Sequence, residues 1–166
     1  MTTPHPLSSR TAAGAVVLLF GYNGLVIGAY AASIPVLRAR FGLEPWQLAL
    51  FFVCMGLAGI ASMQVAGRLA DRHGARRVAL AMLPVLVVAI QGIGCAPTLP
   101  ALFVAGVVLG LANGGIDVSM NAIGVQVERR RPRPIMSFFH GMWSVGNLAG
   151  AVLLVATASL FGGAAE

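Results

Sequence analysis

The 166-residue sequence contains no lysine, and only 10% of its residues carry a charge. Soluble domains are about one quarter charged, so the scarcity of charge excludes an ordinary water-soluble domain. Hydrophobic residues make up 58% of the chain, and the mean hydropathy is +0.86. These values predict an integral membrane protein with the lipid bilayer as its principal partner.

Residues suited to disulfides, metal sites or catalysis are also scarce. The two cysteines, Cys54 and Cys95, lie in apolar segments, where a thiol usually packs as a small hydrophobic group. Neither the HExxH zinc motif nor the GxSxG nucleophile motif occurs. We therefore expect no catalytic residue, no metal and no cofactor, and an enzyme is the least favoured class.

Acidic residues are few, and the net charge is +6. A nucleic-acid partner is not expected, because most arginines lie in two short clusters without an accompanying basic face or aromatic platform. Short basic loops remain on the cytoplasmic side of a membrane. Arg10 falls on the same side, and only Arg38 and Arg40 fall on the other, so the amino terminus is predicted to be cytoplasmic. The clustered arginines are Arg68, Arg72, Arg76, Arg77, Arg129, Arg130, Arg131 and Arg133.

Five apolar runs are long enough to cross a bilayer. A tail at residues 1–10 precedes the first run, which exceeds the about 7 to 15 residues of a signal-peptide core and therefore predicts a membrane helix. Pro35 is expected to end this helix, and the sequence VLRARFGLEPWQ to form a loop. The predicted class is an all-α membrane protein with a tail at 162–166 and helices at about 11–34, 46–66, 78–95, 101–127 and 135–161.

The stretch from Gly67 to Arg77, GRLADRHGARR, separates two of these runs. It resembles the loop between the second and third helices of major facilitator superfamily transporters, G-x-L-x-D-R-x-G-[RK]-[RK], with Ala75 at a usually basic position. The resemblance implies a cytoplasmic gate motif that holds the two halves of a transporter together. Its residues here are Gly67, Leu69, Asp71, Arg72, Gly74 and Arg76.

The family resemblance covers the chain from Arg10 to Phe161. Members of this superfamily are built from two six-helix halves, and each half is a pair of inverted three-helix repeats. The chain therefore resembles an amino-terminal half without its last helix, which predicts a fragment whose partner is a missing carboxyl-terminal half. The alternative is a membrane remnant that does not transport, or a module that assembles with another chain.

The fourth apolar run carries the acidic residue that lies deepest in a predicted helix. Placing Asp117 there costs about 2.5 to 3.5 kcal/mol, so we expect it to face protein or water and treat it as a functional candidate. Asn113 and Asn121 lie four residues to either side, which puts all three on one helix face. A purely structural role, in which Asp117 pins helices together, is the alternative. A second stripe, Gly106, Gly110 and Gly114, predicts close approach of a neighbouring helix.

The fifth run carries another polar face, with His140, Trp143 and Asn147 at helical spacing. Amides and an indole together suit a sugar-like solute, although His140 and Trp143 are also common interfacial packing residues. In the first run Asn23 is followed by glycine, as Asn113 is in the fourth. The predicted path for solute and protons is Asn23, Asn113, Asp117, Asn121, His140, Trp143 and Asn147.

Two finer features bear on the transport mode that the resemblance implies. Many proton-linked members carry an arginine where this chain has Gly106, and the sequence GMWSVGNLAGA lacks the proline typical of drug antiporters. The segments NGGIDVSMNAIGVQVE and FFHGMWSVGNLAG instead resemble bacterial members near the fucose-permease branch. This resemblance implies proton symport of a small polar solute across the inner (plasma) membrane by a multi-pass protein.

Overall fold

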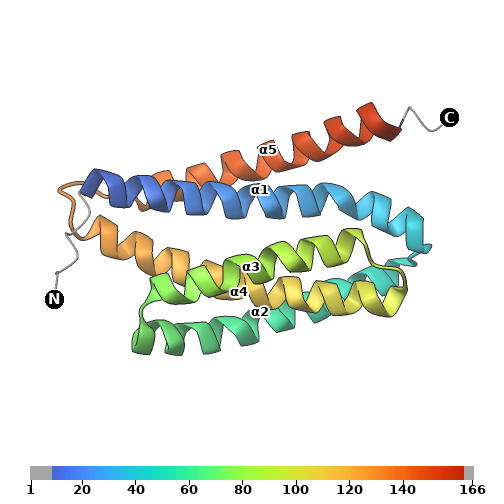
Figure 1. Ribbon diagram of the computed structural model, residues 1–166, viewed down its shortest axis with the longest axis horizontal. Helices are drawn as coiled ribbons and strands as arrows, with labels where there is room; N and C mark the ends of the chain where they lie inside the picture. The colour runs from blue at the N-terminus through green and yellow to red at the C-terminus, as the bar shows by residue number, and fades with distance from the viewer. Residues whose placement is uncertain (1–8, 163–166) are drawn as a thin grey trace.

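The computed structural model describes residues 9–162, which form five α-helices and no strand (Figure 1). Each helix is long and apolar enough to cross a membrane, which confirms the predicted fold class. Residues 1–8 of the expected first tail and 163–166 of the expected last tail lie outside the described residues. The helices are α1 (Ser9–Phe41), α2 (Pro45–His73), α3 (Ala75–Gly94), α4 (Leu99–Glu128) and α5 (Met136–Gly162).

Helix α1 differs from the expected range of 11–34 because Pro35 lies inside it. A proline removes one backbone donor, but membrane helices tolerate this loss when nearby groups satisfy the freed backbone. The carbonyl that Pro35 leaves without its usual donor is that of Ala31, four residues earlier. The helix nevertheless continues to Phe41, and the expected loop shrinks to residues 42–44, where Gly42 takes a φ of +60°.

The expected basic loop at 67–77 is also mostly helical. Helix α2 continues to His73 and α3 begins at Ala75, so only Gly74 separates them. Gly74 has a φ of +88°, which is strained for any other residue, and its N–H donates to the Ala70 carbonyl at 2.9 Å. Cationic side chains in the last turn of α2 interact favourably with its carboxyl end, which favours the longer helix.

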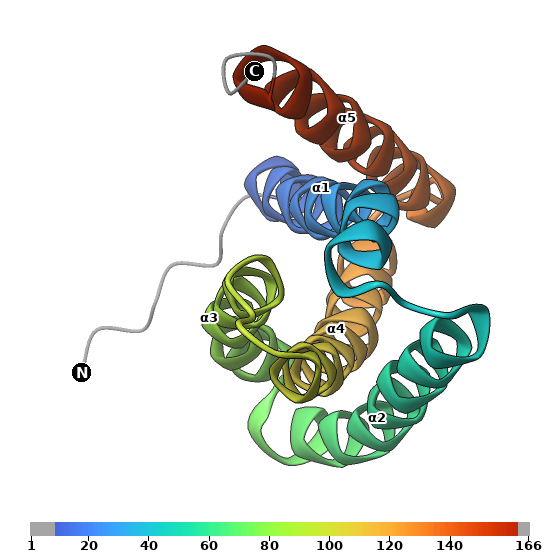
Figure 2. The same cartoon turned by 90° about the vertical axis from the view of Figure 1, so that its right-hand side faces the viewer.

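Viewed along the helices, α4 lies in the middle, with α2 and α3 against it and α1 above it, and α5 rests on α1 (Figure 2). Glycines set two of these contacts. A Cβ atom at Gly28 of α1 would overlap the Asn147 carbonyl of α5, and one at Gly110 of α4 would overlap the Met55 carbonyl of α2. The predicted stripe of Gly106, Gly110 and Gly114 is thus the surface on which α2 packs.

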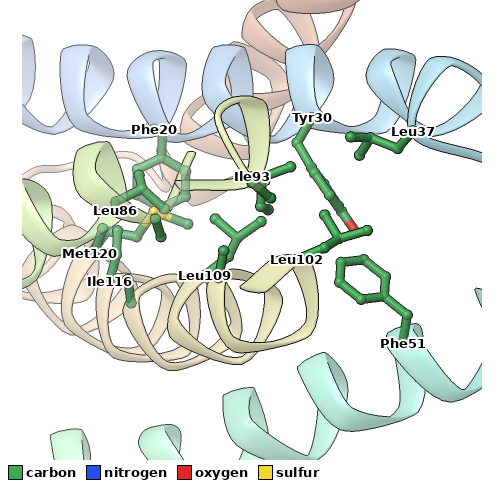
Figure 3. Close-up of a cluster of buried hydrophobic side chains, with 14 of the residues drawn as sticks. Phe20, Tyr30, Leu37, Phe51, Leu86, Ile93, Leu102, Leu109, Ile116 and Met120 are labelled. Atoms are coloured by element: carbon green, nitrogen blue, oxygen red, sulfur yellow. The ribbon is translucent and has the colours of Figure 1, made fainter. Parts of the chain in front are cut away.

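The apolar core gathers around α4. Leu102, Leu109 and Ile116 of α4 are almost completely buried between α1, α3 and the start of α2 (Figure 3). Helices α2 and α5 bury few of their residues within the described part of the chain, and apart from Phe51 and Phe139 many of their large apolar side chains are exposed. Outward apolar side chains are the expected surface for lipid or for further membrane-embedded protein.

Candidate functional site

Polar side chains from three helices meet beside the middle of α4. The Trp143 indole N–H of α5 donates to Asn23 Oδ1 of α1 at 2.8 Å, and Asn23 Nδ2 donates to Asn113 Oδ1 of α4 at 3.0 Å. Asn23 is only 2% exposed, so both of its hydrogen bonds lie inside the bundle. The structure therefore joins three of the predicted path residues into one chain of hydrogen bonds.

A second polar group lies one turn further along α4. Asn121 Nδ2 donates to the Asp117 carbonyl at 2.9 Å and to Asp117 Oδ1 at 3.3 Å. His140 of α5 acts electrostatically on the Asp117 carboxylate, and its ring meets the Phe20 ring edge to face with centroids 5.3 Å apart. Asp117 and Asn121 thus form a half-buried polar pair on α4, and the exposed His140 of α5 is the cationic group that acts on its carboxylate.

The predicted stripe along α4 divides between these two groups. Asn113 bonds across to α1, whereas Asn121 bonds back to Asp117 on the same helix. Asn147 joins neither group: its backbone packs against Gly28, and its side chain makes no hydrogen bond with the described residues. Six of the seven predicted path residues are therefore gathered, and Asn147 contributes to packing between α1 and α5.

The predicted gate residues lie at the junction of α2 and α3, away from both polar groups. Asp71 and Arg72 lie in the last turns of α2, and Arg76 lies in the first turn of α3. All three side chains are exposed, and Asp71 makes no hydrogen bond or ion pair with a described residue. Within the described part of the chain, these side chains are accessible to an outside partner.

Two charged residues have roles that the sequence analysis missed. The Arg40 guanidinium donates to the Gly94 carbonyl at 2.7 Å and to the Ala96 carbonyl at 2.8 Å, so it ties the end of α1 to the end of α3. The Glu128 carboxylate accepts from the backbone N–H groups of Ile135 and Met136, each at 2.7 Å. An acidic group at a helix start is a recognised signal, but Glu128 lies too far before α5 to fit the usual capping spacing.

A pocket of about 230 Å³ lies between α1, α2 and α4, next to the Asn23–Asn113 bond. Its polar side chains are Tyr30 and Asn113, and four glycines of α2 and α4 form much of its wall. A larger groove of about 680 Å³ runs between α1 and α3 and is almost wholly apolar, with Arg76 at one end. Among residues 9–162, no three His, Cys, Asp or Glu side chains are grouped to hold a metal ion.

The chain belongs to the major facilitator superfamily, whose family model matches residues 16–165. It is 36% identical over 132 residues to the uncharacterized transporter y4wD of Sinorhizobium fredii, covering 80% of this chain and 35% of that protein. An uncharacterized MFS-type transporter of Yersinia pestis is 37% identical over 134 residues, covering 81% of this chain and 35% of that protein.

The membrane protein MosC of Rhizobium meliloti is 32% identical over 136 residues, covering 82% of this chain and 33% of MosC. The chain therefore spans about a third of the length of these relatives. No solved structure matches it.

Proposed function

We propose that the chain is the amino-terminal part of a secondary transporter that carries a small polar, sugar-like solute together with protons across the inner membrane. The observation that carries this proposal is the convergence of α1, α4 and α5 on two adjacent polar groups, one built from amides and an indole and the other around Asp117. The names of two relatives, both transporters, support the general activity.

Depth in the membrane supports the role of Asp117. It lies about 5 Å along the helix from the centre of α4, at about 1.5 Å per residue. Transporters of this architecture bind solute and coupling ion near the bilayer midplane, where the two repeats meet. A carboxyl group at this depth can take a proton from one side and release it to the other as access to the site alternates.

The amide and indole groups suit the solute. Asparagine offers both donors and acceptors to hydroxyl groups, and an indole face provides an apolar surface for a sugar ring. Neither group carries a charge, so a neutral solute enters without a desolvated ion pair. The amides therefore bind the solute, and the Asp117 carboxylate binds the proton.

Replacing Asp117 with asparagine tests proton coupling, because the substitution keeps shape and hydrogen bonding but removes the ionisable group. In the complete transporter we expect Asp117→Asn to abolish accumulation of solute driven by a pH gradient while solute exchange continues in part. Gln126→Ala is the matched control: it removes an exposed amide of the same helix that belongs to neither polar group, and it should retain pH-driven accumulation. If accumulation in Asp117→Asn follows the pH gradient as in the parent, Asp117 only packs helices together.

The orientation is also a proposal, and it rests on the arginine clusters at the α2–α3 and α4–α5 junctions. Cysteines placed at Ala75 and Pro132, after Cys54 and Cys95 are replaced by serine, should resist a membrane-impermeant thiol reagent in intact cells. A cysteine at Thr98, at the other end of the bundle, should react. The opposite labelling pattern would place the amino terminus outside.

For the gate motif we propose that exposed Asp71 meets the missing half at the cytoplasmic end of the bundle, near the amino end of one of its helices, where the helix dipole favours a negative charge. Asp71→Asn in the complete transporter should then slow transport without loss of membrane insertion. Unchanged transport kinetics in this variant would remove Asp71 from the gate.

A further inference from the structure

Two pairs of helices pack in the same way. In the first pair, a Cβ atom at Gly24 of α1 would overlap the Trp143 carbonyl of α5. In the second, a Cβ atom at Gly114 of α4 would overlap the Gly59 carbonyl of α2. Gly24 follows Asn23, and Gly114 follows Asn113, so Trp143 and Gly59 occupy equivalent places beside the two asparagines.

The two places are filled differently. Beside Asn23 the Trp143 indole fills the space and donates its N–H to the amide oxygen. Beside Asn113, Gly59 has no side chain, and the 230 Å³ pocket lies there instead, lined by Gly56, Gly59 and Asn113 among others. The pocket is thus the vacant counterpart of the space that an indole occupies in the other pair.

Trp143 also fixes which group Asn113 presents. An indole N–H can only donate, so Asn23 must turn its Oδ1 toward Trp143 and its Nδ2 toward Asn113. Asn113 then accepts through Oδ1, which leaves its own Nδ2 as the free end. This Nδ2 makes no hydrogen bond with a described residue and is not fully enclosed, so a molecule in the pocket can reach it.

The Tyr30 side chain forms part of the wall of the same pocket. It is 6% exposed, and in Figure 3 it extends from α1 toward Leu102 of α4 and Phe51 of α2, which do not line the pocket. Asn113 is therefore the polar side chain that a molecule in the pocket would meet.

We propose that the pocket between α1, α2 and α4 is a solute subsite in which Asn113 Nδ2 donates to an acceptor oxygen of a neutral solute. The solute's hydroxyl, carbonyl or ring ether oxygen faces Asn113, and its apolar surface rests on the glycine wall. The pocket is smaller than the about 300 Å³ at which sites for drug-sized ligands begin, so it takes a single small ring or one end of a larger solute. Trp143 does not line this pocket, so toward this subsite it is a positioning residue that acts through Asn23.

The proposal rests on the proposed function only in taking the bound solute to be the transported one. A binding measurement on the chain itself separates the two, because it needs neither a proton gradient nor the missing half. The probe is 1,4-dioxane, a six-membered ring whose two ether oxygens accept hydrogen bonds but cannot donate. The chain, labelled with ¹⁵N at asparagine side chains, is placed in lipid nanodiscs and titrated while the amide signals are followed by NMR.

In the parent chain dioxane should shift the Asn113 side-chain amide signal in a saturable way and leave that of Asn147 unchanged. Gly56→Leu fills the pocket without touching the amide, since a Cβ at Gly56 meets no atom within 4 Å. It should weaken binding at least tenfold. Gly14→Leu is the matched control, because Gly14 is equally open but lies away from the pocket, and it should bind as the parent does.

Trp143→Phe keeps an aromatic ring but removes the N–H that orients Asn23. The Asn113 amide should then respond several-fold less to dioxane, while stability falls only by the small contribution of one interhelical hydrogen bond, a signature that a merely structural role would not produce. An Asn113 signal that does not respond in the parent overturns the subsite. A response that is unchanged in Gly56→Leu does the same, and a response that is unchanged in Trp143→Phe overturns the positioning role.

Discussion

The α1–α5 pair and the α4–α2 pair share one packing device and differ at one position. In both, glycines let two helix backbones touch, and in both an asparagine lies next to the contact. The first pair is sealed by the indole of Trp143, whereas the second has Gly59 and an open pocket. The comparison shows that two helix pairs can share one packing device while one carries an interhelical hydrogen bond and the other leaves a pocket.

The glycine contacts that the two pairs share contribute more to stability than the hydrogen bonds in which the pairs differ. Backbone contact between helices forbids any added side chain, and overpacking costs about 1 to 3 kcal/mol or more. A hydrogen bond between membrane helices contributes about 0.6 kcal/mol on average and about 1.7 at most. Breaking the shared glycine contacts should therefore have the largest effects, and changing the polar groups smaller ones.

The largest effect is expected from Gly28→Val and Gly110→Val, one in each pair. Each places a branched side chain against a backbone carbonyl, of Asn147 or Met55, which cannot move without separating the helices. We expect each to lower the free energy of unfolding by about 3 kcal/mol or more. Unfolding in mixed detergent micelles measures this, and Gly14→Val, where a Cβ meets no atom, is the control. Equal stability of the three variants would contradict the backbone contact.

Removing the asparagine of each pair should have a smaller effect on stability, and the effect should differ between the two pairs. Asn23→Leu removes the partner of both Trp143 and Asn113, while Asn113→Leu leaves the bond from Trp143 to Asn23 intact. We expect a loss of about 1 to 2 kcal/mol for Asn23→Leu and about half of that for Asn113→Leu. Asn147→Leu, which removes no hydrogen bond with the described residues, gives the baseline in the same unfolding assay. A loss for Asn113→Leu that equals or exceeds that for Asn23→Leu would show that the network is not centred on α1.

The smallest effect is expected at the helix ends. Glu128→Ala removes the acceptor for the first N–H groups of α5, and Glu128→Gln keeps an acceptor oxygen but removes the charge. Hydrogen exchange at Ile135 and Met136 should speed up most in the alanine variant and less in the glutamine variant, with little change in melting temperature. Arg40→Gln, at the opposite end of the bundle, should leave these two amides unchanged and speed exchange at the end of α3. If the exchange rate at Ile135 is the same in the Glu128 variants as in the parent, water satisfies these N–H groups.

Much of this architecture follows from the sequence, because long apolar runs leave few alternatives to membrane helices. The sequence shows an Asn-Gly pair in both α1 and α4, but only the structure shows that Asn23 and Asn113 are joined by a direct hydrogen bond. Pairing of helices is different: an apolar run does not say which neighbour it meets, so the contact of α1 with α5 appears only in three dimensions. Local rules failed at Pro35, which α1 accommodates inside the helix, and at the basic stretch, where cationic side chains near the end of α2 favour a longer helix.

The sequence also could not show which side chains contact one another at the site. Side-chain spacing placed Asn113, Asp117 and Asn121 on one face, but spacing cannot show that Asn113 turns to α1 while Asn121 turns back to Asp117. The role of Gly59 was equally hidden, because the absence of a side chain has meaning only next to its counterpart Trp143. A site defined by what is missing at one position can be found only when both copies of the repeat are seen together.

Helix α1 has its chief partner at the far end of the chain, and this order matters during synthesis. Asn23 and Trp143 are 120 residues apart, a stretch that ribosomes complete in about 6 to 24 s at about 5 to 20 residues per second. Until α4 and α5 enter the membrane, α1 holds an amide whose final partners do not yet exist. Helix α1 is thus made well before the helix that locks it in place, and any interruption of translation before α5 leaves its polar centre without Trp143.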